Sequence, residues 1–430
     1  MPSWSFKFFA DQPTVPLSSL APESFKIIYR NKGADELRMV FAPDKPEGSA
    51  LNFDLRGGIQ AFTTDGNTTT RVFVGFLSKI RHRQSGSNKT VEVTWSGGWA
   101  YLSRNMYYQT WPAGHVTPSV GTYNKPYRFH YTSHVILGRC PAIFVDSGLH
   151  ADNVQLTFNE QICHILQTAG LTEGLSDPLH SEYIQVSNNY VPMSERYNIT
   201  GEEAMNACLS YFPDVSTWFD YGTTAFHATR SRGTPLNVQA GPAVELDVAR
   251  SASAEVVGVS LRFENYYPSP SSNPKYYSSS AYGYSSDDAI RAVMSDPELS
   301  PFPDTLVETF GMLDNVAPRD ISAGLAEQIY NSARGPFFDG HIVLVGETPP
   351  GLGTYRPGKS INITGGNSEW ASMSAPIQTV EFDIGEGRTT ISFGPHPPAG
   401  PQDLVSLALS FRNHTQVQSL SRMSTSAVSS

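Results

Sequence analysis

Short runs of β-branched and aromatic residues, separated by turn residues, occupy the chain from residue 25 to residue 95. This pattern is typical of an antiparallel sandwich or barrel. In the fifth run, apolar residues at every second position predict that one face lies in a core, and these are Val72, Val74 and Phe76. The predicted strands are Phe25–Tyr29, Glu36–Phe41, Ala50–Leu55, Ile59–Thr63, Arg71–Arg81 and Thr90–Trp95.

Helical spacing of apolar residues follows this β region. A short helix over Trp99–Tyr108 is expected to plug the barrel, and a second is predicted at Phe158–Ala169, where Gly170 provides a left-handed stop. The next helix begins with a capping box, in which Thr200 is the N-cap and Glu203 the third helical residue. These helices indicate an α+β segment between two β regions.

A second series of strand patterns begins in this segment and continues almost to the end of the chain. The turn Gly385-Glu386-Gly387 predicts that the last two strands form a hairpin. Two more helices are predicted, one at Ile321–Ala333 and one that opens at Pro401. The predicted strands are Val215–Tyr221, Ala225–Thr229, Val244–Asp247, Glu255–Tyr266, His341–Gly346, Ser360–Thr364, Ile377–Ile384 and Thr389–Phe393.

The order of these elements predicts an α+β fold that is mainly β, with two antiparallel, tube-like β-barrel domains and an α+β domain between them. An N-terminal arm (1–20) precedes the first barrel (21–115), and the α+β domain covers 116–238. The second barrel combines 239–266 with 336–395, around a loop and helical insertion at 267–335. A C-terminal helix and loose tail (396–430) complete the chain.

Composition excludes several classes of protein. The 430 residues include 40 Asp and Glu and 30 Lys and Arg, a net charge of −10 that disfavours tight binding of nucleic acid. Cys140, Cys163 and Cys208 form no CxxC pair, so neither a disulfide scaffold nor a cysteine zinc site is expected. Without an N-terminal signal pattern or an apolar run of about 18 residues, the chain is expected to be soluble and not inserted in a membrane.

Two side-chain pairs suggest chemistry but have simpler explanations. His130 and His134 have a metal-ligand spacing, yet they precede a strand-like run without an adjacent Glu. Asp214 and Asp220 could form a glycosidase pair, although a turn residue and a strand-edge residue explain them more simply. Neither a nucleophile elbow nor a phosphate loop is present.

We therefore predict no catalytic, cofactor-binding or metal-binding residue, no cofactor and no enzyme activity. Two alternatives remain open. One is a β-rich carbohydrate-active hydrolase using Asp214 and Asp220, and the other is an adhesin that binds glycans through the loop 267–284. Both would use the tyrosines that gather in this region, which are Tyr266, Tyr267, Tyr276, Tyr277, Tyr282 and Tyr284.

Three stretches resemble a known family. The first pairs Arg71–Leu77 with Thr90–Trp95, and the second runs from the helix at Gly201 into Phe212-Pro213-Asp214 and Trp218–Tyr221. The third comprises Gly340–Leu344, Pro357–Ile361, Ile377–Val380 and Ile391–Pro395. From about Phe25 to Arg412, their order resembles the baseplate hub, or late control D, proteins of long-tailed phages, which are similar to the hub part of type VI secretion spikes.

The resemblance implies a structural, late-expressed virion protein at the tail tip, made and assembled in the host cytoplasm. Two barrels in each of three subunits would form a pseudo-sixfold ring, a symmetry adaptor between the hexameric tail tube and a threefold spike. The implied partners are two further copies of the chain, a tail tube or distal tail protein, and a spike or central fibre protein. Genomic DNA would pass through the ring without specific binding.

Overall fold

The computed structural model describes residues 3–8, 13–42, 57–85, 88–107, 139–143, 157–171, 183–189, 194–197, 199–212, 214–230, 232–251, 258–262, 266–268, 282–284, 293–295, 307–308, 331, 337–345 and 355–395. The predicted strand Ala50–Leu55, the helix opening at Pro401 and all but one residue of the helix Ile321–Ala333 lie outside these ranges.

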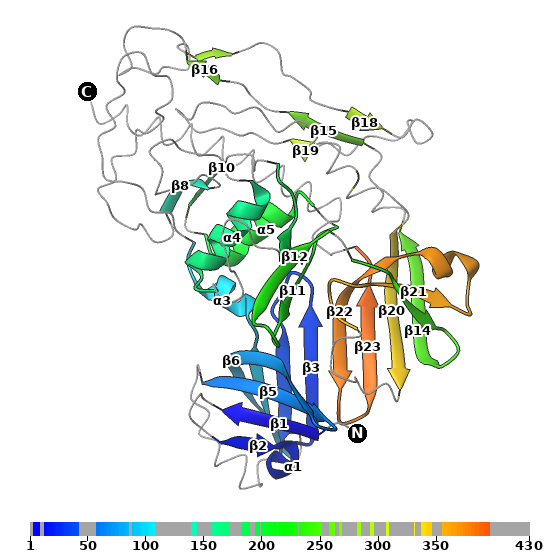
Figure 1. Cartoon of the computed structure of the whole chain (residues 1–430). Helices are drawn as coiled ribbons and strands as arrows, with labels where there is room; N and C mark the ends of the chain where they lie inside the picture. The colour runs from blue at the N-terminus through cyan, green and yellow to red at the C-terminus, as the bar shows by residue number, and fades with distance from the viewer. Residues whose placement is uncertain are drawn as a thin grey trace.

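The first β region contains seven strands and one short helix (Figure 1). Five of the strands match predicted ones, and the segment 1–20, predicted as an arm, adds the other two to the sheet. The elements are β1 (Ser3–Phe8), β2 (Thr14–Pro16), α1 (Leu17–Leu20), β3 (Ser24–Arg30), β4 (Glu36–Phe41), β5 (Gly58–Asp65), β6 (Thr68–Ser85) and β7 (Asn88–Ser96).

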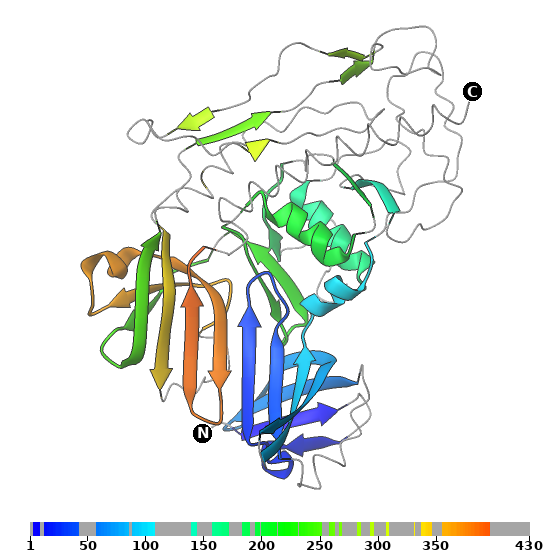
Figure 2. The same ribbon diagram turned by 180° about the vertical axis from the view of Figure 1, so that it is seen from behind.

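A helical layer follows, next to one end of this region (Figures 1 and 2). Its helices pack on a small sheet in the order β11-β12-β9. The elements are α3 (Trp99–Arg104), α4 (Phe158–Thr168), β9 (Ile184–Gln185), α5 (Gly201–Leu209), β11 (Ser216–Asp220) and β12 (Ala225–Thr229).

The second β region contains six strands and a 3-10 helix at Ser368–Ser372. The strands are β13 (Leu236–Gln239), β14 (Ala243–Ser251), β20 (Phe337–Val345), β21 (Ser360–Thr364), β22 (Ala375–Asp383) and β23 (Arg388–Phe393). As predicted, β22 and β23 form a hairpin. The remaining short strands are β8 (Arg139–Ile143), β10 (Ser194–Tyr197), β15 (Gly258–Arg262), β16 (Tyr266–Pro268), β17 (Tyr282–Tyr284), β18 (Val293–Ser295) and β19 (Val307–Glu308).

One continuous sheet joins the two β regions. Its strand order is β14-β20-β23-β22-β3-β4-β7-β6-β5-β1-β2, with β21 and β13 branching from β22. The fold is mainly β, as predicted, and its large sheet is antiparallel except for the pair β13–β21, but no closed barrel is found among the described strands. The reason is that β3 pairs with β4 on one edge and with β22 on the other. A strand has two edges, so β3 has none left to close the first region against β1 or β2.

The first half of the sheet nevertheless curls over its own core. Trp4 and Phe6 of β1 contact Phe25 of β3 edge to face, with ring centroids 5.1 and 5.3 Å apart. Phe8 lies 6.2 Å from Trp95 of β7. Because four strands separate β1 from β3 along the sheet, these contacts require the sheet to fold back on itself (Figure 1).

Two bulges in β6 overturn the expectation that only one of its faces is buried. Val72 is an extra residue between the pairs Ala61–Phe73 and Phe62–Arg71, and the register shifts again between Leu77 and Lys79. Each bulge reverses which face successive side chains occupy. Val72, Phe73, Phe76 and Leu77 are consequently all buried, whereas Val74 is only partly buried.

The helices follow the sequence closely, but α3 lies elsewhere than expected. Thr200 and Glu203 form the predicted capping box of α5, and Gly170 adopts a left-handed φ of 77° after α4. Instead of plugging a barrel, α3 places Trp99 and Leu102 in the core of the helical layer. Trp99 Nε1 also donates to Glu202 Oε1 of α5 at 2.9 Å, which ties the two helices together.

Candidate functional site: the junction of the sheet and the helical layer

The turn between β3 and β4 lies where both halves of the sheet meet the helical layer. The backbone N–H of Asn31 donates to the backbone carbonyl of Gln378 in β22 at 2.8 Å, and the side-chain Nδ2 of Asn31 donates to Gln378 Oε1 at 2.9 Å. The backbone N–H of Thr217 in β11 donates to Asn31 Oδ1 at 2.8 Å. One side chain therefore connects three parts of the fold. We call Asn31, Asp35, Thr217, Tyr221 and Gln378 the junction.

Asp35 and Tyr221 form the buried centre of the junction. Tyr221 Oη donates to Asp35 Oδ2 at 2.6 Å, and the backbone N–H of Arg30 donates to Oδ1 at 2.8 Å. The Asp35 backbone carbonyl also accepts from Gly97 N–H at 2.8 Å. These bonds satisfy polar groups that burial would otherwise penalise.

Burial governs the acid–base behaviour of this pair. It raises the pKa of Asp35 to about 7, although the hydrogen bonds from Tyr221 and the Arg30 N–H favour the carboxylate. The pKa of Tyr221 is raised well above its usual value by burial and by the negative charge of Asp35. The carboxyl group therefore changes its charge near neutral pH.

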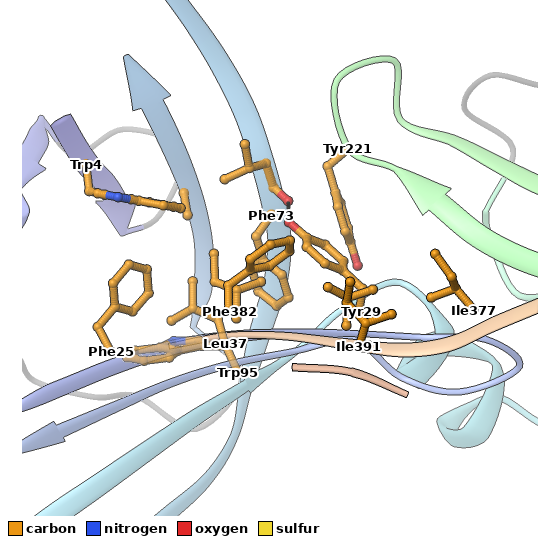
Figure 3. Close-up of a cluster of buried hydrophobic side chains, with 14 of the residues drawn as sticks. Trp4, Phe25, Tyr29, Leu37, Phe73, Trp95, Tyr221, Ile377, Phe382 and Ile391 are labelled. Atoms are coloured by element: carbon orange, nitrogen blue, oxygen red, sulfur yellow. Dashed lines mark hydrogen bonds between the residues drawn. The ribbon is translucent and has the colours of Figure 1, made fainter. Parts of the chain in front are cut away.

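Tyr221 reaches from the end of β11 into the core of the sheet (Figure 3). Its ring lies 5.4 Å from that of Phe73 and 6.4 Å from that of Tyr29, which in turn contacts Phe382 of β22 at 6.0 Å. Tyr29 Oη donates to Val72 O at 2.7 Å, at the first bulge of β6. Aromatic contacts thus fix the helical layer to both halves of the sheet.

The closest approach in the junction occurs at Gly97. A Cβ at this position would lie 2.2 Å from Tyr221 Oη and 3.1 Å from Asp35 Cβ. Only a glycine leaves room for the tyrosine hydroxyl to reach the carboxylate.

A second group of charges adjoins the junction. Lys32 has a left-handed φ of 52°, and its N–H donates to Thr217 Oγ1 at 2.8 Å. Burial lowers the pKa of Lys32 to about 7, against the attraction of Asp214, and burial also lowers the pKa of Arg232. Asp214 itself pairs with Arg230 at 2.8 Å.

The structure gives Asp214 and Asp220 separate structural roles. They lie before and at the end of β11, where Asp214 binds Arg230 and Asp220 accepts the N–H of Gly222 at 2.9 Å. A glycosidase pair instead has two carboxyl groups facing one sugar bond. This geometry does not support the hydrolase alternative.

The other candidate residues are only partly described. His130, His134, Tyr276 and Tyr277 lie outside the described residues. Backbone pairing of β16 with β17 sets Tyr266 opposite Tyr284 and Tyr267 opposite Gly283, next to Tyr282. Cys163 and Cys208 are buried in the core of the helical layer. Within the described ranges, no group of three or more His, Cys, Asp or Glu side chains could hold a metal, and no helix is long and apolar enough to cross a membrane.

Sequence reasoning missed the junction. Asp35 belongs to no motif, and Tyr221 stands only in the stretch Trp218–Tyr221 that carries part of the family resemblance. Their partners lie far away in the sequence, since the residue numbers of Asp35 and Tyr221 differ by 186 and those of Asn31 and Gln378 by 347. The one local signal is Gly97-Gly98, two adjacent glycines at the end of a strand, which indicates a close approach.

Comparison with known proteins identifies the class of fold. No family model and no curated protein sequence matches the chain. The tail protein from Neisseria meningitidis MC58 is similar in structure, with a TM-score of 0.50 and 10% identity, over 94% of this chain and 99% of that one.

Two prophage proteins are also similar. The 43 kDa tail protein of prophage MuSo2 from Shewanella oneidensis has a TM-score of 0.48 at 13% identity, over 93% and 99% of the two chains. The prophage tail protein gp18 from Listeria monocytogenes EGD-e has a TM-score of 0.46 at 8% identity, over 96% and 98%. The tail protein from Neisseria meningitidis MC58, with its TM-score of 0.50, confirms the resemblance to a tail protein at the level of the fold.

Proposed function

We propose that the chain is a structural hub subunit at the tip of a phage tail. Three copies form a ring that joins the hexameric tail tube to a threefold spike and lets DNA pass. The fold shared with a tail protein over nearly the full length of both chains supports a structural role in a tail.

The single observation that carries the proposal is the continuous sheet. It contains two β regions per chain, paired edge to edge through β3 and β22, so that one copy supplies two neighbouring wall segments. Three copies would then supply six, the number that a hexameric tube requires. The junction holds both segments and the helical layer in one fixed arrangement.

The remaining partners follow from the same proposal. A tail tube or distal tail protein lies on one face of the ring, and a spike or central fibre protein lies on the other. The net charge of −10 favours passage of DNA without binding, because a negative surface repels phosphates. In this role the chain needs no enzyme activity and no cofactor.

The proposal is tested by the mass and the shape of the purified protein. Light scattering at micromolar concentration is expected to give three times the 47.1 kDa of one chain. Class averages of negatively stained particles are expected to show a threefold ring with an axial hole. A strictly monomeric species, or a compact oligomer without a hole, would contradict the proposal.

A further inference from the structure

The β6–β7 hairpin carries an exposed row of positive charge on an otherwise acidic protein. Lys79, Arg81 and Arg83 alternate along β6 and are all exposed. Side chains two residues apart share one face of a strand and lie about 7 Å from each other. The intervening Ile80 packs against the core of the sheet, so the three cations project from the opposite, outer face. We call them the basic ladder.

The hairpin compensates little of this charge. Arg81 stands opposite Glu92 of β7 in the register, and Glu92 Oε2 binds Arg83 at 2.6 Å. Glu92 is therefore one acid facing three cations, and the outer face of the hairpin keeps a net positive charge.

The last strand of the sheet carries the complementary pattern. Glu245 and Asp247 of β14 are exposed and alternate with Leu246 and Val248, which pack against the core. The two acids therefore share the outer face at the same spacing of about 7 Å. Glu245 also contacts His341 of β20 at 3.1 Å. We call Glu245 and Asp247 the acidic ladder.

An exposed apolar spot adjoins the acidic ladder. Val244, at the bulge that begins β14, is 62% exposed, and Val345, at the end of β20, is 52% exposed. These are two of the three large exposed hydrophobic side chains in the described part of the chain. Apolar residues beside charged ones are typical of a protein–protein contact.

The acidic ladder begins near the end of the sheet at which the hairpin lies, but in the opposite half of the sheet. Paired residues lead from Val345 of β20 through Arg388 of β23 and Asp383 of β22 to Lys26 of β3. Close to Lys26, Ser24 pairs with Val40 of β4. The next residue of β4, Phe41, pairs with Val91 of β7, beside the hairpin. Six strands separate β14 from β6 in the sheet order. Surfaces so placed suit a head-to-tail contact between copies, which closes into a ring.

We propose that the basic ladder of one copy docks on the acidic ladder of a second copy. This inference rests on the proposed ring and names the surfaces that form it. A second copy is the occupant that the charges favour, because the chain itself bears the matching acids at the matching spacing. DNA fits less well, because the net charge of −10 repels it.

Charge reversal with rescue tests the docking. Lys79→Glu/Arg81→Glu and Glu245→Lys/Asp247→Lys are each expected to weaken association at least about tenfold, measured by sedimentation equilibrium. The variant with all four changes restores opposite charges at every contact, so its association is expected to return to within about threefold of wild type. Near-UV circular dichroism checks that each variant is folded.

A matched control separates a specific contact from a general effect of charge. Lys89 lies on the same hairpin, but its pairing with Gln84 puts it on the other face from the basic ladder. Arg81→Glu alone is expected to weaken association, and Lys89→Glu to leave it as in wild type. Equal effects of the two single changes would overturn the inference.

The remaining outcomes are distinct. A wild-type trimer that tolerates both double reversals, or a fourfold variant that stays dissociated, overturns the ladder contact and leaves the hub proposal standing. A third outcome is that the wild type binds a 30-base-pair DNA duplex and that Lys79→Glu/Arg81→Glu abolishes this binding while the trimer stays intact. That outcome assigns the hairpin to nucleic acid and also overturns the contact. A monomeric wild type contradicts the hub itself.

Discussion

Asp35 is a carboxyl group buried beneath the turn between β3 and β4, and its pKa of about 7 makes stability depend on pH. The folded pKa lies above the value of 3.8 for an exposed aspartate, so the folded state binds the proton more tightly. The free energy of unfolding therefore falls as pH rises from about 4 to about 7, on the order of 3 to 4 kcal/mol from this group.

Asp35→Asn is expected to remove this contribution, because the amide does not ionise. Relative to wild type, the variant gains stability as pH rises through this range, measured by urea unfolding at several pH values. Asp65→Asn, at an exposed position outside both ladders, is the matched control. A constant difference between Asp35→Asn and wild type from pH 4 to pH 7 would contradict the prediction.

Gly97 leaves no space for a larger residue beside Tyr221. Gly97→Ala is expected to lower the free energy of unfolding by about 1 to 3 kcal/mol, because the new methyl group overlaps Tyr221 Oη. In a Tyr221→Phe background the hydroxyl is absent, so the same change is expected to cost less. Thermal unfolding of the four proteins in this cycle measures the difference, and a cost that is the same in both backgrounds would point to another cause.

Helix α5 shows how an element can be predicted from local signals alone. Thr200 accepts the N–H of Glu203, whose side chain accepts the Thr200 N–H at 2.7 Å. Thr200→Ala is expected to destabilise the protein by about 1 kcal/mol, with increased hydrogen exchange in the first turn of α5. Thr200→Ser keeps the hydroxyl and is expected to behave like wild type.

Strands were predictable to different degrees. Alternation gave the bounds of β4 without error, because Leu37, Met39 and Phe41 face one core. The same reasoning failed in β6, where bulges carry core residues onto both faces. Strand β1 also alternates, with Trp4, Phe6 and Phe8 buried, although the segment 1–20 was predicted as an arm. Bulges and distant partners depend on tertiary pairing, which local pattern does not contain.

At the scale of the whole molecule, the pairing of β3 with β22 replaces the two separate barrels expected from the sequence. Phe382 of β22 is 1% exposed, and its ring contacts that of Tyr29 across this pair. The two β regions therefore share one core, and they are expected to unfold together.

Phe382→Ala tests this shared core. The variant is expected to lose about 3 to 5 kcal/mol and still unfold in a single transition, with hydrogen exchange rising in β4 and β23 alike. Ile162→Ala in α4, whose side chain lies in the separate core of the helical layer, is the matched control. Two separate calorimetric transitions in wild type would show that the regions are independent.

The pairing of β3 with β22 also constrains how the chain folds during translation. Lys26 of β3 binds Glu381 of β22, a partner 355 residues further along. The edge of β3 that pairs with β22 therefore stays unpaired until nearly the whole sheet has been translated. Unpaired strand edges promote aggregation. Folding of the N-terminal half is thus completed late, and truncated products that lack β22 should be recovered as insoluble material.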